Sequence, residues 1–231
     1  SVPKAATSNW QRVFNSLLSN GTKSPEEYTG YKVHKIANRF PKVVDNLLQN
    51  GVETSYADEL EKRLNDPEFT VFINVRHPFT RLISAWRDKF DSNKSSFSYW
   101  QRKFGFYIEK RFEKEEYIKN KPESHFISKE AFLDYVADVP VKYFDHHWKT
   151  FQHFCKPCLI KYDLISHAET SNDDGQFILK AAKVDKIVHL PGIYASSPTL
   201  KSKTVEMFAN VSKSTVERLY EKYRADFDMF G

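Results

Sequence analysis

The chain has 231 residues, of which 40% are hydrophobic and 15% aromatic, so it can bury one sizeable core and a single domain is the default expectation. Its formal net charge of +5 favours polyanionic partners, but the charge is spread along the chain and does not choose among nucleic acid, acidic lipid and acidic glycans. No hydrophobic stretch approaches the roughly 20 residues that a membrane span needs, and no signal peptide is visible.

The first residues have the pattern of a phosphate-binding loop that leads into a helix. Pro3 and Lys4 precede a Thr-Ser-Asn run, and the sequence Asn20-Gly21 then ends the expected helix. Its apolar residues fall on one helical face: Trp10, Val13, Phe14, Leu17 and Leu18. Backbone N–H groups at a helix start, together with a lysine, make an anion site.

A second site of the same kind is expected further along the chain. After a polar-faced helix over residues 56–65, an apolar run over residues 69–75 predicts a strand that is covered on both faces. It leads into Arg76 and a helix that begins near Pro78, where the first helical turn tolerates proline. Two anion sites in one α/β domain suggest a ligand with phosphate at both ends.

The remaining elements complete an alternating pattern. Residues 91–127 carry no strong strand signal and are expected to form helices and loops, and Ser128 is a good N-cap for a helix over residues 129–136. The rest of the pattern is a strand over 158–165, a helix near 175–182, a turn-rich loop bearing cations over 194–203 and an amphipathic helix over 215–227. Alternating strands and helices predict a mainly parallel α/β sheet.

These motifs, in this order, resemble those of Golgi carbohydrate sulfotransferases of the chondroitin and dermatan 4-O-sulfotransferase and HNK-1 sulfotransferase type. In that family a Pro-Lys-x-x-x-Ser/Thr-Asn-Trp segment holds the 5′-phosphosulfate of PAPS (3′-phosphoadenosine-5′-phosphosulfate). Residues 76–90 match the family's 3′-phosphate segment almost throughout, with Trp86 in place of the usual tyrosine. Other landmarks extend the resemblance nearly end to end: His147-Trp148, Cys155-Lys156-Pro157-Cys158, Tyr162 to Ile165, Glu169-Thr170 and Tyr223 to Phe230.

The resemblance implies an α/β, single-domain, P-loop-like sulfotransferase fold over residues 1–231, with a central, mainly parallel sheet flanked by helices. It implies a PAPS-dependent enzyme without a metal that sulfates a glycan, with the 4-hydroxyl of GalNAc in chondroitin-type chains as the expected acceptor. It also implies a type II Golgi membrane protein whose catalytic portion is lumenal, with the anchor and first strand upstream of this sequence. Nucleic acid is not an expected partner.

Two other classes of protein compete with this interpretation. An ATP- or GTP-hydrolysing P-loop protein would need Gly-x-x-x-x-Gly-Lys-Ser/Thr and an acidic magnesium ligand at the end of a strand. This chain has neither, because its strand ends in Arg76. A non-catalytic basic module that binds glycosaminoglycans would explain the charge, but it would not explain the pairing of Pro3-Lys4 with Arg76 and Ser84.

The resemblance also assigns residues to the nucleotide. Lys4 is expected to stabilise the bridging oxygen of the leaving phosphate, although a surface lysine is the alternative. The residues expected around the 5′-phosphosulfate are Lys4, Ala5, Ala6, Thr7, Ser8, Asn9 and Trp10, of which the polar three could instead be helix caps. Arg76 and Ser84 are expected at the 3′-phosphate. Lys201 and Lys203 are candidates for a loop that closes over the nucleotide, or for solvated residues. Arg81 and Arg87 could simply pair with acidic residues, and Trp86 is expected in the core.

The general base is predicted to be His34. It is the only histidine between Lys4 and Arg76, the interval in which a related uronyl 2-O-sulfotransferase group keeps its catalytic histidine. An unperturbed histidine titrates near pH 6.5, so a modest shift lets it take a proton at Golgi pH. His147 is the second candidate, but it is expected to bind the glycan acceptor, together with Glu169.

Other residues indicate the cellular compartment. Asn20, Asn93 and Asn210 lie in N-glycosylation sequons, which fit a secretory-pathway protein. Two cysteines alone cannot build a tetrahedral zinc site. A disulfide between Cys155 and Cys158 is therefore favoured over two free thiols, as expected in an oxidising lumen.

Overall fold

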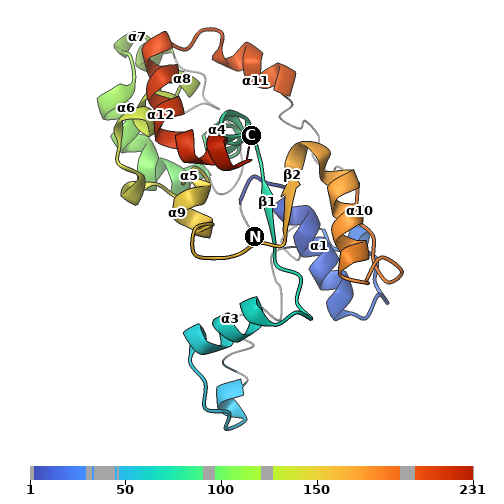
Figure 1. Ribbon diagram of the computed structural model, residues 1–231. Coiled ribbons are helices and arrows are strands. Elements are labelled where there is room, and N and C mark those ends of the chain that lie inside the picture. The colour runs from blue at the N-terminus through green and yellow to red at the C-terminus, as the bar shows by residue number, and fades with distance from the viewer. Residues whose placement is uncertain are drawn as a thin grey trace. The chain divides into compact units, whose positions relative to one another are not determined.

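A computed structural model describes residues 3–29, 33, 45, 47–90, 97–120, 127–192 and 201–230 (Figure 1). The chain divides into two compact units, which are described separately below. The first unit comprises Ser1–Val75 and Pro157–Ser196, and the second comprises Arg76–Lys156 and Ser197–Gly231. The expectation of one catalytic domain over all 231 residues stays a prediction.

The first unit contains a parallel pair of strands. β1 (Phe72–Val75) pairs with β2 (Leu164–His167), with Phe72 opposite Leu164 and Val75 opposite His167. Its helices are α1 (Thr7–Leu18), η1 (Pro25–Glu27), α3 (Tyr56–Asn65), η5 (Ala168–Thr170) and α10 (Ser171–Ala181). The expected α/β class and parallel pairing are therefore present, but the sheet has only two strands among the described residues.

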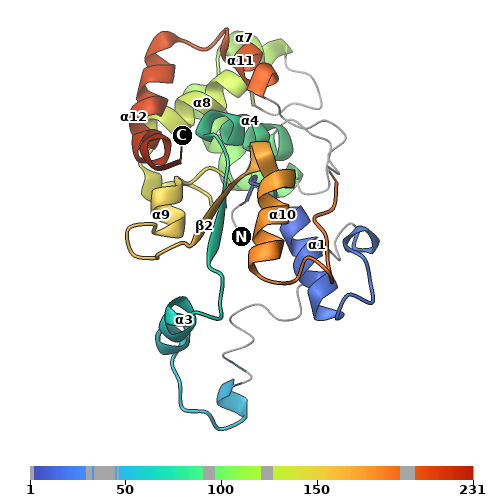
Figure 2. The ribbon, with the colours of Figure 1, turned by 45° about the vertical axis from the view of Figure 1, so that its right-hand side comes forward.

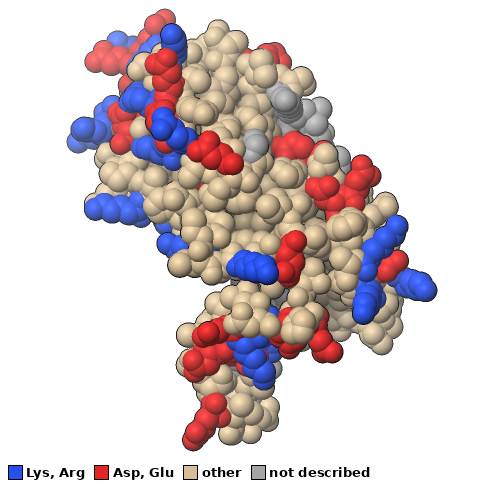
Figure 3. Space-filling model, viewed as in Figure 1, with Lys and Arg blue, Asp and Glu red and all other residues tan. Residues whose placement is uncertain are grey.

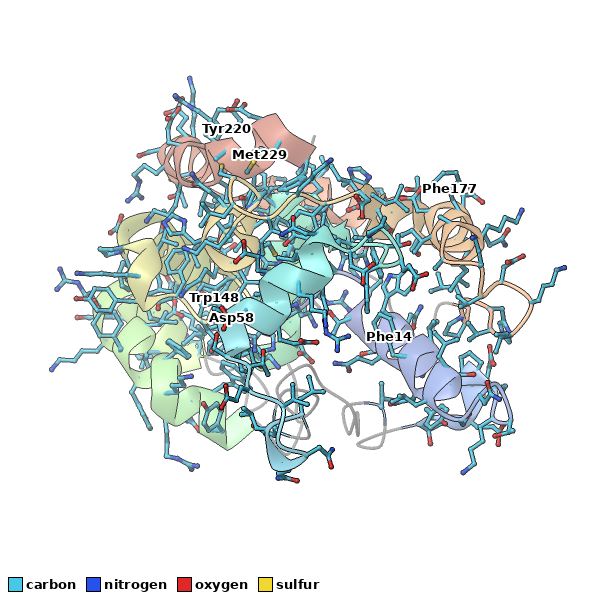
Figure 4. All side chains as sticks on the ribbon, turned by 60° about the horizontal axis from the view of Figure 1, so that its bottom comes forward. Phe14, Asp58, Trp148, Phe177, Tyr220 and Met229 are labelled. Atoms are coloured by element: carbon cyan, nitrogen blue, oxygen red, sulfur yellow. The ribbon has the colours of Figure 1, made fainter. Side chains whose placement is uncertain are left out.

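Helices α1 and α10 cover one side of these strands (Figures 1 and 2). Trp10 and Val13 of α1 form a buried cluster with Ile178 and Leu179 of α10, and Phe72 of β1 packs against it. At the outer edge of this layer, Phe14 on α1 and Phe177 on α10 keep exposed rings (Figure 4). Burial of the cluster fixes the start of α1 beside the strands.

The predicted strand over residues 158–165 is wrong at its beginning. Residues 157–160 form a turn in which Leu159 is 82% exposed, and β2 starts only at Leu164. The apolar run Cys158-Leu159-Ile160 has the composition of a buried strand. In the structure these three residues are exposed or only partly buried, and burial rather than composition stabilises a central strand.

The second unit is helical. Its core contains Leu82, Ile83, Phe132, Trp148 and Leu219, all of them fully buried (Trp148 is labelled in Figure 4). The helices are α4 (Pro78–Lys89), α5 (Phe97–Trp100), the π-helix η3 (Gln101–Gly105), α6 (Phe106–Phe112), α7 (Glu115–Asn120), α8 (Lys129–Asp138), η4 (Val141–Tyr143), α9 (Phe151–Cys155), α11 (Lys201–Phe208) and α12 (Lys213–Phe230).

Several local predictions are confirmed in this unit. The Ser128 hydroxyl caps α8 by accepting a hydrogen bond from the Ala131 N–H, and Pro78 is the first residue of α4. Trp86 is 7% exposed and belongs to the core, as expected. The predicted loop over residues 194–203 is corrected at its end, because Lys201 and Lys203 lie in α11, whose Thr204 is buried against Thr80 of α4. None of the described helices is long and apolar enough to cross a membrane.

Candidate functional site

The loop before α1 has an unusual backbone conformation. Lys4 and Ala6 have φ angles of 67° and 51°, in the left-handed region that residues with a Cβ adopt at a cost of roughly 1–2 kcal/mol. Ala6 is the N-cap of α1, and neither a capping side chain nor an acidic residue is present in the first turn of this helix. The alternative interpretation, in which Thr7, Ser8 or Asn9 caps α1, therefore does not hold. A helix start of this kind attracts an anion.

Two buried polar residues of the strands hold this loop. Asn74 of β1 donates a hydrogen bond from Nδ2 to the Ala5 carbonyl oxygen over 2.7 Å, and Ser166 of β2 donates to Asn74 Oδ1 over 3.1 Å. Ala5, Asn74 and Ser166 are all nearly inaccessible to solvent. The strands therefore fix the strained loop through a polar network that is satisfied internally.

The last residues of the predicted phosphate segment are held elsewhere. Asn9 donates to the Pro191 carbonyl oxygen over 3.3 Å and accepts a hydrogen bond from Arg12 over 3.2 Å. Trp10 is 3% exposed, and its ring centroid lies 4.5 Å from that of Phe72. Trp10 thus anchors α1 in the core, and its predicted contact with a nucleotide stays a prediction.

The second predicted anion motif begins where β1 ends. Arg76 follows the last residue of the strand directly, and Ser84 lies two turns into α4. Both residues are partly exposed, whereas Leu82, Ile83 and Ala85 around Ser84 are buried. The apolar face of α4 therefore fixes the helix, whereas the side chains of Arg76 and Ser84 stay partly exposed.

Arg81 has a different role from its neighbours in this motif. It is 1% exposed and donates hydrogen bonds to the carbonyl oxygens of Lys149 over 2.6 Å and His146 over 2.8 Å. Its guanidinium lies 4.6 Å from the centre of the Phe151 ring. These contacts tie α4 to residues 146–149.

The C-terminal helix α12 also holds the segment that follows Asp145, through residues near the start of α9. Asp226 of α12 accepts hydrogen bonds from the backbone N–H groups of Phe151 and Gln152 over 2.7 and 3.0 Å, at the start of α9. The Tyr223 hydroxyl donates to the Trp148 carbonyl oxygen. Burial raises the pKa of Asp226, although these hydrogen bonds and the charge of Arg81 oppose the rise. The segment between Asp145 and Gln152 is thus fixed at several points.

His147, predicted to bind an acceptor, lies in this segment. Its Nδ1 is 2.5 Å from Asp145 Oδ1, and its ring meets Trp100 edge-on with centroids 5.1 Å apart. Burial lowers the pKa of His147 to about 4, and the opposing hydrogen bond to Asp145 does not compensate. His147 is therefore neutral over the range in which most enzymes work. Glu169 lies exposed in η5 of the first unit.

Comparison with known proteins agrees with these motifs. The model of the "Sulfotransferase family" matches residues 1–231. The chain belongs to the sulfotransferase family. It is similar to "Carbohydrate sulfotransferase 10" of Gallus gallus and Homo sapiens (33% and 32% identity over 241 and 240 residues) and to "Carbohydrate sulfotransferase 11" of Rattus norvegicus (33% over 234). Each match covers all of this chain and 62% of the relative, so the chain spans under two thirds of their length. No solved structure matches it significantly.

The structure describes some of the other predicted sites, namely two of the three sequons and both cysteines. His34 and Asn93 lie outside the described residues, whereas Asn20 and Asn210 are exposed, as sites for glycan attachment must be. The predicted disulfide is not formed, since Cys155 and Cys158 are not bonded to each other. Cys155 ends α9 on its buried side, where burial raises the pKa of its thiol to about 11, while Cys158 lies exposed in the following turn.

Three residues of the site were missed in the sequence. Asn74 and Ser166 were missed, although each is a polar residue within an apolar strand segment, and such residues are buried only when they have a partner. Asp145 was also missed, although it stands two residues before His147. A carboxylate so close to a candidate histidine was the available signal.

Proposed function

We propose that this chain is the catalytic portion of a PAPS-dependent carbohydrate sulfotransferase, and that it sulfates the 4-hydroxyl of GalNAc in chondroitin-type chains. The observation that carries the proposal is the strained lysine loop before an uncapped helix start, in a chain that matches the sulfotransferase family over its whole length. The names of the relatives support a carbohydrate acceptor. The GalNAc 4-hydroxyl rests on the resemblance of the motifs alone.

The residues present fit the two ends of the nucleotide. The first-turn N–H groups of α1 and the Lys4 ammonium suit a 5′-phosphosulfate, and the planar guanidinium of Arg76 with the Ser84 hydroxyl suits a 3′-phosphate. PAPS would supply the sulfuryl group. Lys201 and Lys203, on α11, are proposed to add positive charge near the nucleotide. Thr7 and Ser8 are proposed to donate hydrogen bonds to the phosphosulfate.

The proposed reaction transfers the sulfuryl group in one step. The acceptor oxygen forms a new bond to sulfur, and the bond from sulfur to the bridging phosphate oxygen breaks. The electron pair of the broken bond leaves with adenosine 3′,5′-bisphosphate. Lys4 is proposed to stabilise the charge that grows on the bridging oxygen, which makes a metal unnecessary for this step. His34 is proposed to take the hydroxyl proton, and His147 and Glu169 to bind the acceptor.

The charges on the face drawn in Figure 3 do not favour a plain glycosaminoglycan-binding module. On the face in Figure 3, the side chains of lysine and arginine alternate with those of aspartate and glutamate, and they do not gather into one basic patch among the residues drawn there. A module that holds polyanions by charge alone relies on clustered cations.

We further propose that the protein acts in the Golgi lumen, held by a membrane anchor outside this sequence.

The 3′-phosphate assignment predicts a selective loss of nucleotide affinity. Arg76→Ala should weaken binding of adenosine 3′,5′-bisphosphate by roughly 2–5 kcal/mol, because a charge-assisted contact is lost, and Ser84→Ala by about 1 kcal/mol. Binding of 5′-AMP, which lacks the 3′-phosphate, should change much less. Calorimetry with both nucleotides measures the difference.

A matched control is Arg102→Ala, which removes an exposed arginine of the same unit and should leave both affinities unchanged. Equal weakening of both nucleotides in the Arg76 and Ser84 variants would show that these residues do not recognise the 3′-phosphate. Wild-type protein that binds neither nucleotide would contradict the donor assignment as a whole.

A further inference from the structure

Asp145 and His147 form a carboxylate–imidazole pair in the second unit. Their side chains are 4% and 14% exposed, and His147 Nδ1 lies 2.5 Å from Asp145 Oδ1. The same carboxylate oxygen accepts a hydrogen bond from the His147 backbone N–H over 3.1 Å. Asp145 Oδ2 faces the ammonium of Lys103 at 3.3 Å. Asp145 therefore contacts His147 through both its ring and its backbone.

The pair has a defined protonation state. Burial raises the pKa of Asp145, but the hydrogen bonds from the side chain and backbone of His147 outweigh it and hold this pKa well below its usual range. Burial lowers the pKa of His147 to about 4, helped by the nearby charges of Lys89 and His146. Between pH 5 and 8 an ionised carboxylate thus faces a neutral imidazole. Such a carboxylate can only accept, so Nδ1 carries the proton and Nε2 carries the lone pair.

The Nε2 atom of His147 has no hydrogen-bond donor among the described residues, and it is not one of the buried side-chain atoms that lack a partner. The side chain of His147 as a whole is 14% exposed. Nearby, Lys89 lies with its ammonium 4.6 Å from the centre of the Trp100 ring and pairs with Asp88. The side chain of His146 is half exposed. Within the part of the chain that the structure describes, Nε2 is therefore an acceptor without a donor, beside cationic and aromatic groups.

The backbone around the pair is rigidly held. Arg81 binds the carbonyl oxygens of His146 and Lys149, and Tyr223 binds that of Trp148, which is fully buried. The edge of the His147 ring packs against Trp100. An imidazole that is fixed by its hydrogen bond to Asp145 and by the surrounding backbone is preorganised to bind one group in one direction.

A metal centre is a poorer account of the same residues. Asp145, His146 and His147 form the one cluster of three potential metal ligands among the described residues. Two ligand atoms on one ion, each about 2.0–2.2 Å from the metal, lie about 3 Å or more apart. The 2.5 Å between Asp145 Oδ1 and His147 Nδ1 is a hydrogen bond and leaves no room for both atoms on one ion.

We propose that Asp145 is a positioning residue which holds His147 with an unprotonated Nε2, and that this nitrogen accepts a hydrogen bond from a hydroxyl group of the glycan acceptor. This inference rests on the proposed function, because it assigns the acceptor side of the same reaction. It also specifies chemistry, since a lone pair favours hydroxyl or amide N–H donors and disfavours a uronate carboxylate. His147 would therefore recognise a neutral part of the sugar.

The test reverses the tautomer while it keeps the shape of the pair. In Asp145→Asn the amide can donate to Nδ1, which moves the ring proton to Nε2 and turns the acceptor into a donor. We expect the KM for the glycan to rise about 10-fold to 100-fold, with a smaller change in kcat and with the affinity for adenosine 3′,5′-bisphosphate unchanged. His147→Gln, whose amide oxygen can stand near the position of Nε2, should retain more acceptor affinity than His147→Ala.

A direct readout is the nitrogen NMR spectrum of the histidine rings. In the wild type, Nε2 of His147 should be unprotonated from pH 8 down to about pH 5, and in Asp145→Asn it should be protonated. Glu26→Gln is a matched control: it changes the exposed Glu26–His189 pair of the first unit and should leave the glycan KM unaltered.

A protonated Nε2 in the wild type would overturn the proposal, and this measurement does not require the variant to fold. A glycan KM that is unchanged in both Asp145→Asn and His147→Ala, or a fall in kcat alone, would overturn it as well. If the tautomer is as expected but the wild type binds no bisphosphate and sulfates no glycan, the proposed function has failed and the inference about the acceptor fails with it.

Discussion

Lys4→Ala is expected to lower turnover by about 10²–10³-fold, which is the usual effect of removing one group that stabilises charge in the transition state. The affinity for adenosine 3′,5′-bisphosphate should stay within a few-fold, because Lys4 acts mainly on charge that develops as the bond to sulfur breaks. Steady-state rates with PAPS and a glycan, together with calorimetry on the bisphosphate, measure the two quantities separately.

The first unit also supplies a control for this experiment. Lys23→Ala removes an exposed lysine from the same unit and should have no effect on turnover. The backbone of Lys4 is left-handed and lies beside the network of Ala5, Asn74 and Ser166, so the stability of the variant must be checked. Thermal unfolding should show that Lys4→Ala is folded. Full activity of the Lys4 variant would remove this residue from the mechanism.

His34→Ala is expected to lower turnover by about 10²–10⁴-fold, the usual contribution of a positioned base, with nucleotide affinity intact. A neutral imidazole accepts the proton and an imidazolium cannot, so the wild-type rate should fall at acidic pH, where the base becomes protonated. This acidic limb should disappear in the variant. The full profile of rate against pH tests the assignment.

His147→Ala is the comparison for this profile. Because His147 is proposed to bind the acceptor, its removal should raise the glycan KM more than it lowers turnover, and the acidic limb of the wild type should persist. The pKa of His147 is lowered to about 4, so His147 itself stays neutral above that pH. If His34→Ala kept the acidic limb and His147→Ala lost it, the base would be His147 and the assignment would be wrong.

Elements with local signals could be predicted from the sequence. The helix α3 has its predicted bounds because Ser55 and Asp58 form a capping box and Asp66 precedes a proline. The start of α4 at Pro78 and the cap of α8 at Ser128 follow from equally short-range chemistry. The family resemblance assigned both proposed anion motifs to positions in the sequence, because each is a continuous stretch; their role stays a prediction.

The remainder depends on contacts between distant residues. Arg81 could not be distinguished from a surface arginine because its partners are carbonyl oxygens 65 and 68 residues away. Asn74 similarly reaches back 69 residues to Ala5. The strand expected to begin at residue 158 does not form there, because the residues at its start are not buried. The predicted disulfide does not form either: Cys155 is buried at the end of α9, whereas Cys158 is exposed after it. Such outcomes depend on burial, which local patterns do not encode.

The most direct test of the proposed activity is transfer of a radioactive sulfuryl group from PAPS to desulfated chondroitin, dermatan, terminal GalNAc and HNK-1-type acceptors. We expect the wild type to label chondroitin at the 4-hydroxyl of GalNAc, and Lys4→Ala to transfer almost no label. Label on another of these glycans would revise the acceptor and keep the enzyme class. Retention of glycans without any transfer, and without binding of adenosine 3′,5′-bisphosphate, would contradict the account and indicate a non-catalytic glycan-binding module.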